Sequence, residues 1–293
     1  MVILGVATLV FLLLHLAPGD PVEAMLGESA GTADRAALRA ELGLDAPLPL
    51  QYWRFLRGLA AGDFGHSLHT RESVAQAIAE RLPYTAALAG AALGLAIAFA
   101  LPLGLYSALR AGSRLETLTS VAAVIGMSVP SFVLGPLLML VFAVWLGWLP
   151  VAAAGTAAGL VLPALTLGLA LAALLARMVR AAVREVLDED YIKSARARGL
   201  PERRVLWRHA LRNAALPVLT VVGMQLGALL GGAVITEMVF GWPGLGQLTI
   251  EAIQRRDYPL VQGCVLVVSA SYVFINMLTD LLYGLCDPRT VAA

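Results

Sequence analysis

Residues 83–107 read PYTAALAGAALGLAIAFALPLGLYS, a run of 25 residues without a single Asp, Glu, Lys, Arg or His. A helix needs about 20 mostly apolar residues to cross the hydrocarbon core of a bilayer. The run is too long for a transmembrane barrel strand and lacks the alternation of apolar and polar residues that such a strand needs. It therefore predicts a transmembrane α-helix, which satisfies its own backbone hydrogen bonds in lipid.

The composition of the whole chain agrees with this prediction. Hydrophobic residues make up 59% of the 293 positions, charged residues make up 14%, and the mean hydropathy is +0.79. A soluble domain is about 25% charged, and a monomer in water cannot hide so much apolar surface. The composition excludes a soluble enzyme, a disordered chain and a protein that binds nucleic acid, and it indicates a lipid bilayer as the partner.

Five further stretches have the same character, so the predicted fold is an all-α membrane protein with six transmembrane helices in one domain, residues 1–293. The predicted spans are 2–17, 83–107, 118–148, 160–176, 216–240 and 260–285. The third span is overlong and contains Pro130 and Pro136, which predicts a kinked or tilted helix.

The distribution of charge predicts the orientation of these helices. The stretch 177–212 carries ten Lys or Arg, the turn 110–114 carries two Arg and no acid, and both fall on one side if six helices alternate. The positive-inside rule makes that side cytoplasmic, together with both termini. The long loop 18–82 is then extracytoplasmic. Because no Lys or Arg precedes Arg35, we expect a short basic lead upstream of Met1.

The residues of a catalytic or nucleotide-binding site are missing from the sequence. The sole lysine, Lys193, follows Ile192, whereas a P-loop needs Gly-Lys-Ser/Thr. His66 and His69 with Asp63 could form a weak metal site, but a histidine pair in a loop is more often polar surface. We therefore expect no enzyme activity, no metal site and no cofactor in this chain, and we favour transport or conduction.

The segment 183–213 predicts two short amphipathic helices joined by a turn. Gly199 is a typical residue after a helix end, and Pro201 followed by Glu202 is a typical helix start. The first apolar stripe is predicted at Val183, Leu187, Tyr191 and Ala195, and the second helix places Val205, Leu206, His209 and Ala210 on one face and Arg204, Arg208 and Arg212 on another.

Two interpretations of this 183–213 loop are open. A hairpin on the membrane surface would bring its arginines to lipid phosphates. A docking site for a soluble protein would also explain the placement of Gly199 and the acidic residues 188–190, which anionic lipid repels. We favour the docking site.

Several short motifs, taken in their order along the chain, resemble the inner-membrane permeases of oligopeptide, dipeptide and nickel ABC importers. They are Ala-Pro-Gly-Asp-Pro at 17–21, Ser-Val-Pro-Ser-Phe at 128–132, Leu-Pro-Ala-Leu-Thr-Leu at 162–167, Ala-Arg-Ala-Arg-Gly-Leu at 195–200, His-Ala-Leu-Arg-Asn at 209–213, Phe-Gly-Trp-Pro-Gly-Leu-Gly at 240–246, Arg-Asp-Tyr-Pro at 256–259 and Asp-Pro-Arg at 287–289.

The resemblance implies a type I ABC importer permease fold, in which 183–213 is a cytoplasmic two-helix coupling loop. It implies one transmembrane subunit of an ATP-driven importer for peptides or similar small solutes, in the cytoplasmic (inner) membrane of a bacterium or archaeon. The implied partners are a second permease subunit, two ATP-binding subunits that hold ATP and Mg²⁺, and an extracytoplasmic solute-binding protein. Peptide, nickel chelate, opine and glycoside remain open as solutes, with peptide favoured.

In the family that this sequence resembles, the coupling loop carries a Glu-Ala-Ala motif followed by a glycine. Here Lys193-Ser194-Ala195 stands at the motif position, so the usual glutamate is absent, and Gly199 follows. The resemblance carries an ATPase-coupling role to Asp190, Tyr191, Ala195, Arg196, Gly199 and Leu200.

Polar residues within the spans are candidates for the translocation pathway, because an ionisable group in lipid is costly. They are Ser128, Ser131, Gln225, Glu237, Asn276 and Asp280. Hydrogen bonding between helices is the alternative role for each of them. The alternative function for the chain is an ATP-independent secondary transporter or channel, but we see no internal repeat of the kind such proteins carry.

Overall fold

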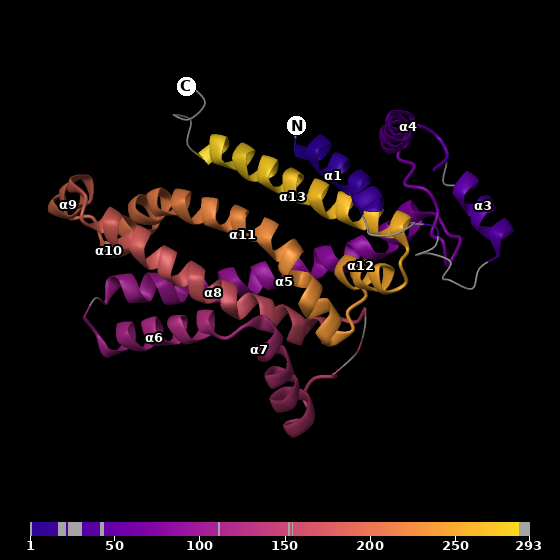
Figure 1. The fold of residues 1–293 in the computed structure, drawn as a ribbon. Helices are drawn as coiled ribbons and strands as arrows, with labels where there is room; N and C mark the ends of the chain where they lie inside the picture. Colours follow the sequence, from indigo (N-terminus) through magenta and orange to yellow (C-terminus); the bar gives the residue numbers. More distant parts are fainter. Residues whose placement is uncertain are drawn as a thin grey trace. The chain divides into compact units, whose positions relative to one another are not determined.

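The computed structural model describes residues 2–16, 22, 31–41, 44–110, 112–151, 153 and 155–286. In these ranges the chain forms helices with short connections (Figure 1), and a single isolated bridge between His66 and Ser73 is the only strand-like pairing. Three of the described helices are long and apolar enough to cross a bilayer, namely Val74–Leu109, Ala157–Leu187 and Tyr258–Leu281. The predicted all-α membrane fold is confirmed.

The chain divides into two compact units. The first comprises Met1–Pro83 and Pro243–Val273, and the second comprises Tyr84–Trp242 and Phe274–Ala293. Helices α5 (Val74–Leu109) and α13 (Tyr258–Cys286) each run through both units. Each unit is therefore built from two pieces of sequence that lie far apart.

Among its described residues, the first unit contains four more helices, α1 (Val2–Leu16), α3 (Thr32–Glu41), α4 (Leu48–Ala60) and α12 (Leu245–Gln254). Its main apolar cluster joins the start of α5 to α12 and α13. The buried members are Val74, Ile78, Leu245, Leu248, Ala252, Leu260 and Cys264.

A buried carboxylate, Asp257, connects two segments of the first unit just before α13. It accepts hydrogen bonds from the Ser67 hydroxyl, from the Leu68 backbone N–H at 3.2 Å and from the Leu260 backbone N–H at 3.4 Å. Asp257 therefore ties the connection that follows α4 to the first turn of α13.

In the second unit α8 (Ala157–Leu187) packs between α6 (Arg114–Ser128) and α11 (Leu211–Phe240), as Figure 1 shows. The distal part of α5 packs closely against α8 at two glycines. A Cβ on Gly104 would lie 2.7 Å from the Ala176 carbonyl oxygen, and one on Gly168 would lie 2.8 Å from that of Ala92. Only glycine allows the two backbones to approach this closely.

The third predicted span is corrected by the structure. Instead of one kinked helix, α6 ends at Ser128 and a separate helix α7 (Ser131–Leu138) begins after Pro130 and continues as a π-helix, η1 (Met139–Trp145). The residue before a proline avoids the helical conformation, which explains the break. Pro136 remains inside α7.

The other predicted spans exist as helices, but most are longer than predicted. Helix α5 begins nine residues before 83, and α8 continues eleven residues past 176. These extensions carry the charged side chains that the apolar criterion excluded. The sequence motifs at 17–21 and 287–289 lie outside the described residues.

Candidate functional site

The 183–213 loop folds as predicted into two short helices around a glycine turn. Helix α9 (Asp190–Ala197) is followed by α10 (Glu202–Arg204), which continues as a π-helix, η2 (Val205–Ala210), into α11. Gly199 has a φ of +75°, and a Cβ there would meet nothing within 4 Å. The backbone conformation, rather than lack of space, therefore explains the glycine.

The loop has a small apolar core of its own. Ile192, Ala195, Val205 and Ala210 are at most 1% exposed, and Val186 and Leu187 of α8 pack against them. Part of the predicted apolar stripe is wrong, because Ile192 takes the interior position and Tyr191 is 39% exposed. Helix α8 ends before Asp188, and α9 begins after Glu189. The four-residue repeat of α8 therefore does not continue into α9.

Two ion pairs stabilise the turn and α9. Arg196 donates to Glu202 across the turn, with Nη2 to Oε1 at 2.6 Å and Nε to Oε2 at 3.2 Å. This hydrogen bond lowers the pKa of Glu202 below its ordinary value. Lys193 Nζ lies 2.9 Å from Asp190 Oδ1, and that hydrogen bond likewise lowers the pKa of Asp190. Lys193, at the position of the missing motif glutamate, is thus engaged within its own helix.

A further contact joins α9 to α11. Asn213 Nδ2 donates to the Tyr191 hydroxyl oxygen at 2.6 Å. With the apolar contacts to Val186 and Leu187, the loop is attached to the ends of both α8 and α11. A displacement of α9 would therefore act on both helices.

The six residues assigned to coupling lie together in this loop, with different exposures. Asp190, Tyr191, Arg196 and Gly199 are exposed, Leu200 is half-buried and Ala195 belongs to the interior. Their contact with an ATPase stays a prediction.

Sequence reasoning missed an exposed aromatic side chain beside the arginines of the loop. Trp207 is 65% exposed, and with Pro201, Arg203, Arg204 and Arg208 it lines a shallow hollow of about 630 Å³. The signal was a tryptophan on the basic face of an amphipathic helix. Such a side chain suits a protein interface.

The polar residues predicted for the pathway lie on α6, α7, α11 and α13. Glu237 is fully buried, and the Thr85 hydroxyl donates to its Oε1 at 2.7 Å, which ties α11 to α5. The other five are placed as follows: Ser128 and Asp280 are exposed, whereas Ser131, Gln225 and Asn276 are half-buried. Their role in a pathway stays a prediction.

A charged cluster joins α6 to α8. Glu116 accepts from Arg180 and from the backbone N–H of Gly112, and Arg184 approaches it at 3.5 Å. Residues 112–114 therefore lie at the same end of these helices as the beginning of the basic stretch 177–212. This is the arrangement that the charge pattern requires of a six-helix topology.

Within the described residues no group of three His, Cys, Asp or Glu side chains could hold a metal ion. Of the histidines considered for such a site, His69 has Nε2 at 2.7 Å from the Arg255 carbonyl oxygen. The nearby Asp63 accepts from the backbone N–H of Gly65 at 2.9 Å.

Two family descriptions match almost the entire chain. Residues 100–292 match the binding-protein-dependent transport system inner membrane component, and residues 1–89 match the N-terminal part of such components. The chain is 44% identical over 286 residues to the glutathione transport system permease protein GsiC of Pectobacterium atrosepticum, covering 98% of this chain and 94% of the relative. It is 42% identical to the same permease of Escherichia coli K12, covering 97% and 92%.

Two solved structures are similar in fold. One is the MetNI methionine ABC transporter in inward-facing conformations, with a TM-score of 0.60 and 21% identity over 72% of this chain and 97% of the matched chain. The other is an amino acid ABC transporter with histidines, with a TM-score of 0.55 and 16% identity over 73% and 94%.

Proposed function

Because the chain belongs to the family of binding-protein-dependent transport system inner membrane components, we propose that it imports glutathione or a short peptide of similar size. The chain is a permease subunit of an ABC importer, and ATP hydrolysis takes place in separate subunits. The observation that carries the proposed solute is the similarity to glutathione permeases over 98% of the chain.

In this proposal the chain forms half of the translocation pathway and pairs with a second permease. Two ATPase subunits, which hold ATP and Mg²⁺, bind on the cytoplasmic side, and an extracytoplasmic binding protein delivers the solute. The membrane is the cytoplasmic (inner) membrane, and both termini are cytoplasmic. The Glu116–Arg180 contact supports the orientation, since it brings two basic segments to one end.

The 183–213 loop transmits movement of the ATPases in this proposal. Its apolar core and the Arg196–Glu202 ion pair make the loop rigid. Its contacts with α8 and α11 connect it to two long helices. Binding of ATP would bias the helices between inward and outward access, a two-state change driven by ligand binding.

The pathway residues complete the proposal. Ser128 and Ser131 flank the break at Pro130 between α6 and α7, where their hydroxyl groups are the polar groups offered to a solute. Gln225, Asn276 and Asp280 supply polar groups on α11 and α13. Glu237 acts by holding α11 to α5 through Thr85 rather than by touching the solute.

Uptake by the complete complex tests the proposal. We expect proteoliposomes that contain both permeases, the ATPases and the binding protein to accumulate radiolabelled glutathione when ATP is present. They should not accumulate it with a non-hydrolysable ATP analogue. Accumulation of nickel or a glycoside in its place would contradict the solute, and uptake without ATP would support a secondary transporter. The similarity to ABC permeases gives no support to that alternative.

A further inference from the structure

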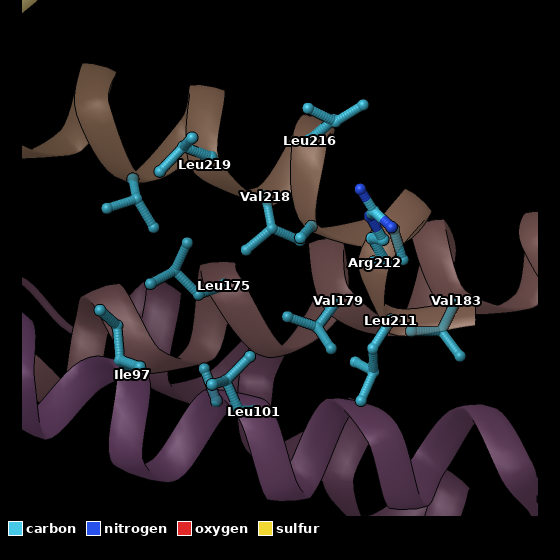
Figure 2. Close-up of a pocket in the computed structure, with 14 residues that line it drawn as sticks. Ile97, Leu101, Leu175, Val179, Val183, Leu211, Arg212, Leu216, Val218 and Leu219 are labelled. Atoms are coloured by element: carbon cyan, nitrogen blue, oxygen red, sulfur yellow. The ribbon is translucent and has the colours of Figure 1, made fainter. Parts of the chain in front are cut away.

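An apolar cavity of about 590 Å³ lies between α5, α8 and α11 in the second unit. Figure 2 shows Ile97 and Leu101 of α5 below it, Val179 of α8 in the middle and Val218 of α11 above it. This volume falls within the range of ordinary ligand sites, about 300–1,000 Å³.

Thirteen of the fourteen lining residues are apolar, and the fourteenth is Arg212. Arg212 lies at the end of the cavity near Leu211 and Val183 (Figure 2). Among the described residues, no hydrogen bond or ion pair engages the Arg212 side chain, which is exposed. The cavity thus combines an apolar interior with one available cation at its end.

This combination does not suit the transported solute. A peptide carries backbone N–H and C=O groups along its length, and burying them without partners costs about 1–3 kcal/mol each. Apart from Arg212, the lining side chains offer no hydrogen-bonding group. An amphiphile with one anionic head and an apolar tail has the matching chemistry.

The length of the cavity also matches a lipid chain. On α11 the lining runs from Leu211 to Val222, which at about 1.5 Å per residue is about 16 Å. One leaflet of the hydrocarbon core is about 15 Å thick, half of the whole. Arg212 therefore lies where a phosphate would sit if the acyl chain filled the cavity.

We propose that this cavity binds one anionic phospholipid, with an acyl chain between α5, α8 and α11 and its phosphate on Arg212. Arginine and phosphate form charge-assisted hydrogen bonds that are stronger than neutral ones. The proposed cytoplasmic location of the 183–213 loop decides only that this lipid belongs to the cytoplasmic leaflet. A lipid in this place would hold α8 and α11 at a fixed distance, next to the ends that the 183–213 loop contacts.

Native mass spectrometry of the purified complex tests the proposal by counting retained lipids. The complex is titrated with phosphatidylglycerol and, separately, with phosphatidylcholine of the same acyl chains. Arg212→Gln should weaken retention of phosphatidylglycerol about tenfold, because a hydrogen bond to a charged group is lost. Ala215→Phe, which places a ring at the exposed edge of the cavity lining, should reduce retention of both lipids.

Matched controls separate this site from general lipid contact. Arg203→Gln removes an exposed charge that does not line the cavity, and Met224→Phe enlarges an exposed side chain of α11 outside it. Both should retain phosphatidylglycerol like the wild type. Equal losses in Arg203→Gln and Arg212→Gln would overturn the proposal.

A photoreactive maleimide attached to Ala215→Cys that cross-links this chain to the second permease in membranes would also overturn it, because a protein would then cover the cavity. If Ala215→Phe fails to assemble, Arg212→Gln tests the proposal by itself, since it leaves the thirteen apolar lining residues unchanged. Lipid retention is measured without uptake, so its failure is distinct from failure of the proposed solute.

Discussion

Arg196 and Glu202 face each other across the turn at Gly199 and share two hydrogen bonds, at 2.6 Å and 3.2 Å. Both side chains are substantially exposed, so the pair contributes only about 0–1 kcal/mol to stability. Its value lies in geometry, because a planar guanidinium bonded at two points fixes the direction in which α10 leaves the turn.

We predict that exchanging these two charges preserves transport. Arg196→Glu alone should reduce ATP-dependent uptake at least several-fold, since two carboxylates would repel each other across the turn. The double variant Arg196→Glu with Glu202→Arg should recover most of it in the same proteoliposome assay. A double variant as inactive as Arg196→Glu would show that the charge at 196 serves a partner instead.

The same pair sets an expectation for pH. The pKa of Glu202 is lowered in the folded protein, so the ion pair contributes fully above the ordinary value of 4.5 and is lost as the pH falls through the lowered value. Retention of the ATPase subunits by a tagged permease should therefore be constant from about pH 5 to 8. A loss of retention within that interval in wild type, absent from Glu202→Gln, would contradict the prediction.

Gly199 should tolerate asparagine better than valine. A positive φ destabilises a residue that has a Cβ by about 1–2 kcal/mol. The destabilisation is smaller for asparagine than for a β-branched residue. Because no atom lies within 4 Å of a Cβ at this position, the backbone is the only internal cost. We expect retention of the ATPases to fall in the order wild type, Gly199→Asn, Gly199→Val.

Gly62 supplies the matched control for this series. It has the same φ of +75° and the same open surroundings but lies in the first unit. Gly62→Val carries the same backbone cost and should leave ATPase retention unchanged. An equal loss in both valine variants would mean that general instability, rather than the coupling turn, explains the effect.

Gly104→Ala should destabilise the helix bundle, whereas Gly94→Ala on the same helix should not. A Cβ at 104 would lie 2.7 Å from the Ala176 carbonyl oxygen and from Val179 Cβ, so α5 and α8 would have to separate at a cost of about 1–3 kcal/mol. Nothing lies within 4 Å of a Cβ at 94, where alanine improves helix propensity. Thermal unfolding in detergent measures the difference, and equal midpoints would refute the close packing.

The Thr85–Glu237 hydrogen bond should be measurable as a coupling energy. Thr85→Val removes a donor to a fully buried carboxyl group, and Glu237→Gln weakens the acceptor. A double-mutant cycle should give a coupling of about 0.5–1.5 kcal/mol, the net value of a typical hydrogen bond. Additive effects of the two substitutions would contradict a direct bond.

Local residue types predicted the turn at Gly199 and the helix start after Pro201, because glycine and proline dictate backbone angles themselves. The interior position of Ile192 instead of Tyr191 could not be predicted in this way. It depends on where α8 stops, and that is decided by the apolar contacts of Val186 and Leu187 with the loop.

The polar contacts between residues far apart in the sequence could not be predicted from it either. Glu237 meets Thr85 across 152 positions, and Arg180 meets Glu116 across 64. Each partner taken alone is an ordinary polar residue within a predicted helical segment. Hydrophobic periodicity therefore predicted which segments are helices, whereas the polar contacts between helices depend on packing that no local pattern encodes.

The division of the first unit between two distant pieces of sequence has a consequence for biosynthesis. Val74 and Ile78 pack against α12 and the start of α13, whose residues emerge from the ribosome more than 160 positions later. Until then Val74 and Ile78 lack their packing partners, and quality-control proteases can attack this part of the chain. A nonsense mutation anywhere before Pro243 would thus leave a fragment that cannot complete either unit, and rapid degradation should be its fate.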